Sequence, residues 1–239
     1  MIKRIYYNIF CSLMIALVSF YTSLYILWKK RKDKEAISFA LVWLSTAFVW
    51  FCIGIYTLSL PVINKPLIKG GQIFIVFTFY AIVYHFAHKI WKGKKIGRLA
   101  VYGVSLIGLY YLILLFICSF PEPIITDWGV AFPPPLVMKY AFFAIIFIIM
   151  SLIIYDLLKR IIFWIKNKKI RDLQRFFATF SIFLYIFAGF FDEWAIHYGG
   201  IQLFLIRITE MFAVLIAYLC YSGESSENSS LLNHQQSLK

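Results

Sequence analysis

The side chains with the clearest potential for chemistry are charged residues inside two long apolar stretches. Asp192, Glu193 and His197 end one stretch, and Arg207 and Glu210 lie within the next. A charged group inside a lipid bilayer is costly, and such groups commonly form ion pairs or functional sites. These five residues are therefore the candidate ligand-binding residues of the chain.

The spacing of these residues predicts that one acid meets the base. A turn is expected at Gly199 and Gly200, with Asp192 seven residues before Gly199. Arg207 follows Gly200 by the same seven residues. Two antiparallel helices leaving the turn hold Asp192 and Arg207 at similar depth, about 10 Å inward by helical rise. An ion pair there would offset part of the desolvation cost of both groups, and Glu210 lies one helical turn from Arg207.

Two interpretations of this cluster stay open. The first is a buried network that fixes how two helices pack. The second is a binding site or proton-responsive site that opens to the outside, in which a ligand or a proton breaks the ion pair. His197 adds a group that titrates near neutral pH, four residues after Glu193 and on the same helical face.

The elements that must position these residues are transmembrane helices. Of the 239 residues, 62% are hydrophobic and 15% are charged, against about 25% charged residues in a typical soluble domain. The sequence predicts an all-α integral membrane protein, a seven-transmembrane-helix bundle whose consecutive helices are antiparallel neighbours. The predicted spans are 8–28, 37–59, 70–91, 98–119, 139–161, 174–196 and 201–221. They form one domain, 1–221, followed by a disordered cytoplasmic tail, 222–239.

The distribution of basic residues predicts the orientation of this bundle. Of the 24 Lys and Arg residues, 17 lie in three short segments, 29–34, 89–98 and 159–175. Cytoplasmic loops carry such an excess, so we expect a multi-pass cell-membrane protein with its N-terminus outside and its C-terminus in the cytoplasm. The first span is not expected to be a cleaved signal peptide, because its basic cluster follows the apolar run. The charge therefore indicates a lipid bilayer as partner, and no nucleic acid.

Prolines lie only in the segments predicted to be outside. None interrupts a predicted span, so we expect continuous helices, unlike those of transporters built from broken helices. The longest outer loop, 121–138, contains three consecutive prolines, which stiffen the backbone. It could cap an outward-facing pocket or simply connect two helices.

Other polar residues within the spans predict no metal or cofactor site. His85 and His88 are expected to be interfacial histidines in a basic rim, and His197 lies too far away, at the other side of the membrane, to share a haem or metal with them. Asp156 precedes Lys159 and Arg160 at helical spacing, which predicts a local surface ion pair. The four cysteines fall in or beside apolar runs with no metal-binding spacing, and are expected to be small buried residues without disulfides.

Several well-known classes of seven-helix protein do not fit the sequence. The seventh span lacks the lysine that a retinal linkage requires, and the third and seventh spans lack the motifs of G-protein-coupled receptors. Seven-helix zinc hydrolases need several inward-facing histidines, which this chain does not supply. No nucleophile, base and metal set converges, so an enzyme is not favoured.

In helix count and orientation the chain is similar to the seven-helix sensory regions of some bacterial histidine kinases and cyclases. That resemblance implies a non-enzymatic sensor or receptor-like module, which would respond to a small molecule or proton from outside and act on a cytoplasmic signalling partner. Two alternatives remain: a small transporter or proton-coupled carrier, and a membrane subunit of a larger complex.

Overall fold

The computed structural model describes residues 2–59, 65–91, 94–118, 124–125, 130–131, 134–168, 170–198 and 200–222. Within these ranges, the side chains at 2–4, 124–125, 130–131, 171, 193–198 and 200 are not described. In the described part of the chain, seven helices are long and apolar enough to cross a membrane. The all-helical architecture with seven candidate spans is therefore confirmed, and these spans suggest a multi-pass membrane protein.

All seven helices begin before the start of their predicted span. They are α1 (Ile2–Lys29), α2 (Lys34–Leu58), α3 (Lys65–Trp91), α4 (Lys95–Ile117), α5 (Leu136–Asn167), α6 (Ile170–Tyr198) and α7 (Gly200–Ser222). The apolar run shows where a helix enters hydrocarbon, but the helical backbone includes the polar turns that flank it. The predicted disordered tail lies outside the described residues, apart from Ser222, which ends α7.

Local chemistry explains several of these boundaries. The Asp33 carboxylate accepts hydrogen bonds from the backbone N–H groups of Glu35 and Ala36, at 2.8 and 3.4 Å, and so caps the start of α2. Pro66 is the second residue of α3, a place where proline is tolerated because first-turn N–H groups have no acceptor within the helix. Lys168 ends α5 in a left-handed conformation, with a φ of 49°.

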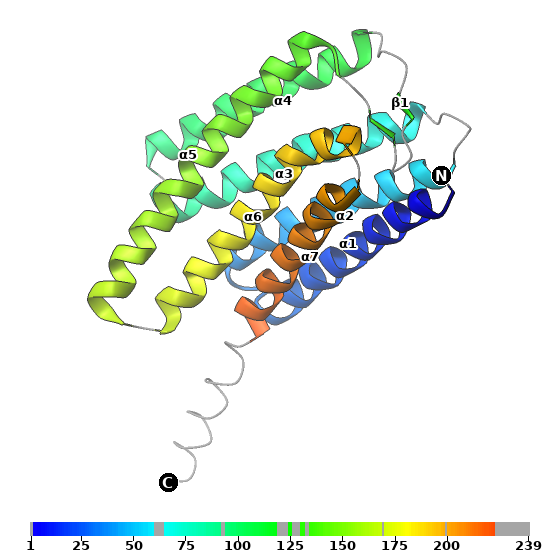
Figure 1. Ribbon diagram of the computed structural model, residues 1–239. Coiled ribbons are helices and arrows are strands. Elements are labelled where there is room, and N and C mark those ends of the chain that lie inside the picture. Colours follow the sequence, from blue (N-terminus) through cyan, green and yellow to red (C-terminus); the bar gives the residue numbers. More distant parts are fainter. Residues whose placement is uncertain are drawn as a thin grey trace.

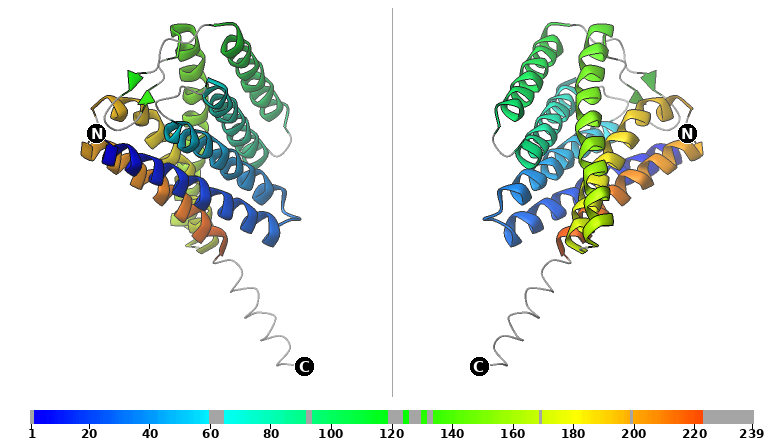
Figure 2. Two further views of the ribbon diagram at one scale, coloured as in Figure 1. Left: turned by 90° about the vertical axis from the view of Figure 1, so that its right-hand side faces the viewer. Right: turned by 90° about the vertical axis from the view of Figure 1, so that its left-hand side faces the viewer.

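Consecutive helices pack against one another, and α1 also packs beside α7 (Figures 1 and 2). Ring contacts between Tyr7 and Phe204 and between Tyr21 and Tyr218 show that α1 and α7 run in the same direction. The helix α4 contacts α3 and α5 and lies at the edge of the bundle (Figure 1). We call the end at which α1 begins the N-terminal end, and the end at which α1 finishes the far end.

The core is richest in aromatic side chains along α2. The fully buried Trp43 indole packs against the Tyr185 ring of α6, with ring centroids 5.7 Å apart. Phe39 lies one turn closer to the start of α2, and its ring centroid is 6.0 Å from that of Trp43 and 5.0 Å from that of Tyr221 on α7. With Trp50, these four residues form what we call the aromatic column, which follows α2 from the N-terminal half of the bundle toward the far end.

A short hairpin lies in the connection between α4 and α5. Its strands, β1 (Ile124–Ile125) and β2 (Val130–Ala131), pair antiparallel with Ile124 opposite Ala131. The second strand contacts α6. Half of the predicted loop 121–138 lies outside the described residues, so both interpretations of it, a cap and a connector, remain predictions.

Candidate functional site

Arg207 lies at the centre of a buried polar cluster in the N-terminal half of the bundle. Its Nη1 atom lies 2.9 Å from Asp192 Oδ1 of α6 and 3.1 Å from Glu210 Oε2, one turn further along α7. The antiparallel pair α6 and α7 brings Asp192 and Arg207 to the same depth on either side of their connection. The predicted pairing of Asp192 with Arg207 is therefore confirmed.

Two further helices contribute to the cluster. From α1, the Asn8 side-chain oxygen accepts a hydrogen bond of 3.0 Å from Arg207 Nε. From α2, the Trp50 indole lies beneath the guanidinium, with 4.2 Å between Arg207 Cζ and the ring centroid, a cation–π contact. Sequence reasoning missed both residues. The available signal for Asn8 was an amide within an apolar run, whereas nothing distinguished Trp50 from the other tryptophans.

The charges of this Arg207 cluster (Asn8, Trp50, Asp192, Arg207 and Glu210) do not balance. One guanidinium faces two carboxyl groups, while Arg207 is only 2% exposed and Glu210 is fully buried. Among the described residues, Glu210 Oε1 and Arg207 Nη2 have no hydrogen-bond partner, and the Asp192 contact is an ion pair without hydrogen-bond alignment. Buried groups of this kind are costly unless a partner satisfies them. The cluster can therefore accept a further positive charge.

The Asp192 side chain is the most exposed of the three charged groups in the cluster. It is 17% exposed, whereas its partners Arg207 and Glu210 are almost completely enclosed. The other two predicted site residues, Glu193 and His197, follow on α6, but their side chains lie outside the described residues. Their part in the site remains a prediction.

A second polar cluster occupies the far end of the bundle and corrects the prediction for Asp156. That carboxylate is not on the surface but 3% exposed. It lies 3.0 Å from Lys89 Nζ of α3 and 2.7 Å from Arg160 Nε, and it accepts a hydrogen bond of 2.6 Å from the Thr179 hydroxyl of α6. Sequence spacing revealed the neighbour Arg160 but could not reveal that α3 and α6 enclose this face of α5.

The prediction that both histidines of α3 are interfacial is wrong for His85. His85 is 2% exposed rather than interfacial, and its Nδ1 atom lies 2.9 Å from the Ser38 hydroxyl of α2 in a hydrogen bond. His88 is half-buried and stacks on Tyr84. Within the described ranges, no group of three His, Cys, Asp or Glu side chains could hold a metal ion. None of the four cysteines, all of which the structure describes, forms a disulfide.

Comparisons of this chain with protein-family models, with curated proteins and with solved structures find no match. A function must therefore be inferred from the side chains themselves.

Proposed function

We propose that this chain is a non-enzymatic sensor or receptor-like module of the cell membrane, with its N-terminus outside and its C-terminus in the cytoplasm. Seven candidate spans support a multi-pass protein. The orientation rests on the basic residues, because 17 of the 24 lie in the segments that connect helices at the far end. In this orientation the Arg207 cluster faces the outside and the far end faces the cytoplasm.

The observation that carries the proposal is the unequal number of acidic and basic groups in the Arg207 cluster. A buried polar group within a membrane span is a functional hypothesis by default, and this one has two carboxyl groups for one guanidinium. A proton or a small cationic ligand would neutralise the excess and would compete with Arg207 for Asp192. Glu193 and His197 would form the rim of the site on α6.

The packing of the core supports a response at the opposite end. Trp50 lies under Arg207, and the aromatic column continues through Trp43 and Phe39 to Tyr221 near the end of α7. A shift of Arg207 would change the packing of Trp50 and of α7 together. Closely packed side chains transmit such shifts because they cannot deform freely. A cytoplasmic signalling partner would read the change at the far end.

A proton-coupled carrier is the second candidate, and a feature of α1 favours it. Four buried hydroxyl groups on α1, and one on α2, have no hydrogen-bond partner among the described residues: Ser12, Ser19, Thr22, Ser23 and Thr46. Hydroxyls elsewhere, such as those of Ser105 and Ser151, bond instead to a carbonyl of their own helix. The α1 groups continue from Asn8 over about 22 Å of helix at 1.5 Å per residue, most of the thickness of the hydrocarbon.

The first experiment measures the thermal stability of the purified full-length protein in detergent, from mildly acidic to mildly alkaline pH. A panel of small cations and metabolites is added at each pH. A ligand that binds the folded state raises the unfolding temperature by mass action. We expect the wild type to respond to pH or to a cation, and Glu210→Gln to abolish the response, because it removes the excess charge at nearly constant size.

Asp156→Asn is the matched control, since it neutralises another buried carboxyl group in an ion-paired cluster at the far end. We expect it to lower stability and to keep the response to pH or ligand. If Glu210→Gln and Asp156→Asn change the response equally, or if the wild type shows none, the Arg207 cluster is a structural network and the proposal fails. Proton flux into proteoliposomes that Glu210→Gln abolishes would select the carrier.

A further inference from the structure

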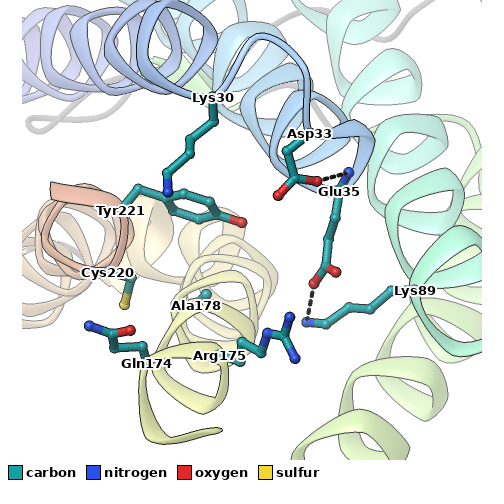
Figure 3. Close-up of a pocket in the computed structure, with 9 residues that line it drawn as sticks. All are labelled: Lys30, Asp33, Glu35, Lys89, Gln174, Arg175, Ala178, Cys220 and Tyr221. Carbon is teal, nitrogen blue, oxygen red and sulfur yellow. Dashed lines mark hydrogen bonds and ion pairs between the residues drawn. The ribbon is translucent and has the colours of Figure 1, made fainter. Parts of the chain in front are cut away.

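A cavity of about 580 Å³, including the part open to solvent, lies at the far end of the bundle (Figure 3). Five parts of the chain form its wall. The lining residues are Lys30 and Asp33 between α1 and α2, Glu35 of α2, Lys89 of α3, Gln174, Arg175 and Ala178 of α6, and Cys220 and Tyr221 of α7.

The two acidic residues of the cavity already have partners. The Asp33 carboxylate accepts hydrogen bonds from two backbone N–H groups at the start of α2. The Glu35 carboxylate lies 4.0 Å from Lys89 Nζ. Lys89 in turn contacts Asp156 at 3.0 Å and donates a hydrogen bond of 2.8 Å to the Thr179 hydroxyl. The acids and Lys89 therefore form the fixed part of the wall.

The Arg175 guanidinium differs from these groups. It points into the cavity from the second turn of α6 (Figure 3), and among the described residues its side chain has no ion pair or hydrogen bond. The Lys30 side chain extends toward the cavity from the connection between α1 and α2 (Figure 3). Among the described residues, the lining carries three basic groups and two acidic groups.

We propose that this cavity binds a phosphate group, with Arg175 as its main ligand and Lys30 as a second charge. The planar guanidinium matches phosphate oxygens with two parallel donors. Basic pockets between transmembrane helices on the cytoplasmic side hold the phosphate of anionic lipids, and a soluble phosphate compound would use the same contacts. This site is separate from the Arg207 cluster and does not depend on the sensor proposal.

The test measures ligand-induced shifts in the unfolding temperature of the full-length protein, in neutral detergent at constant ionic strength. Three probes are titrated: dioctanoyl phosphatidylglycerol, dioctanoylglycerol with the same tails but no phosphate, and inorganic phosphate. We expect phosphatidylglycerol to give a saturable shift and dioctanoylglycerol to give none. If inorganic phosphate gives a shift similar to that of phosphatidylglycerol, the ligand is a soluble phosphate compound. If inorganic phosphate gives no shift and phosphatidylglycerol does, the ligand is the lipid headgroup.

Arg175→Gln should weaken phosphate binding about tenfold, since hydrogen bonds to charged groups contribute more than neutral ones. Lys166→Gln is the matched control, because it removes one positive charge from an exposed position near the end of α5, outside the cavity. It should leave binding unchanged. If Arg175→Gln does not fold, Lys30→Gln replaces it. The proposal is overturned if neither phosphate probe binds, or if the control weakens binding as much as the cavity variant.

Discussion

At the scale of single residues, the Arg207 cluster depends on the shape of the guanidinium group. The Nε atom donates to Asn8, Nη1 lies between two carboxyl groups, and the flat face covers Trp50. Only a planar group with donors along its edge can make these contacts together. The compact ammonium group of a lysine would reach the acids but could neither stack on the indole in the same way nor reach the Asn8 oxygen at once.

The contribution of Asn8 can be measured by truncation. Asn8→Ala removes the acceptor of Arg207 Nε and leaves a buried charged donor unsatisfied. We expect a loss of about 1 to 2 kcal/mol in the free energy of unfolding, measured by denaturant titration in mixed micelles. Asn167→Ala, at the exposed end of α5, is the control and should change little. Equal effects of both variants would show that the Asn8 contact adds nothing to stability.

Spacing in the sequence could predict only those contacts that consecutive helices make. Asp192 and Arg207 lie on either side of one short turn, so equal distances from the turn sufficed to pair them. Asn8 and Arg207 are separated by 199 residues, and their contact depends on α1 packing beside α7. The same limit explains why the burial of Asp156 was not predicted. Its partners Lys89 and Thr179 lie on α3 and α6, and spacing within α5 carries no information about them.

At the scale of helices, the far-end cluster fastens three elements together. Asp156 of α5, Lys89 of α3 and Thr179 of α6 meet around one carboxylate oxygen, at 3.0 Å from Lys89 and 2.6 Å from Thr179. The Thr179 hydroxyl donates to Asp156 and accepts from Lys89. A hydroxyl is suited to this position because it offers one donor and two acceptor sites.

Thr179→Val tests this junction with almost no change of shape. The substitution removes one donor and one acceptor between two buried charged groups, so we expect a loss of about 1.5 to 3 kcal/mol in the free energy of unfolding. Thr209→Val on α7 is the matched control, because the Thr209 hydroxyl bonds, among the described residues, to the Leu205 carbonyl of its own helix alone. It should be nearly neutral. A neutral Thr179→Val in the same denaturant titration would show that Lys89 and Asp156 hold the three helices without the hydroxyl.

Whole helices were the most predictable part of the structure. Long apolar runs without internal proline require a helix, since lipid offers no partner for unpaired backbone groups. Helix ends were less predictable, because a polar cap such as Asp33 starts α2 before its apolar run begins. The helix α5 likewise continues past the predicted end of its span at residue 161 and reaches Asn167.

At the scale of the whole molecule, two polar regions occupy different levels of one bundle. The Arg207 cluster lies toward the N-terminal end, and the cavity lined by Arg175 lies at the far end, with the aromatic column between them. Helices α6 and α7 contribute residues to both regions. The orientation of the bundle in the membrane therefore matters to both proposals. They require the Arg207 cluster to face the outside and the cavity to face the cytoplasm.

Labelling of single cysteines tests this orientation. The four native cysteines are first replaced, and Lys65→Cys or Lys32→Cys is then added, both being exposed positions at opposite ends of the bundle. In intact cells, an impermeant maleimide should label the Lys65 variant and should reach the Lys32 variant only after permeabilisation, because basic loops stay inside. The reverse labelling pattern would mean that the protein has the opposite orientation. The Arg207 cluster would then face the cytoplasm, and the cavity would bind phosphate groups from outside. Labelling of both variants in intact cells would mean that α2 does not cross the membrane, which would contradict both proposals at once.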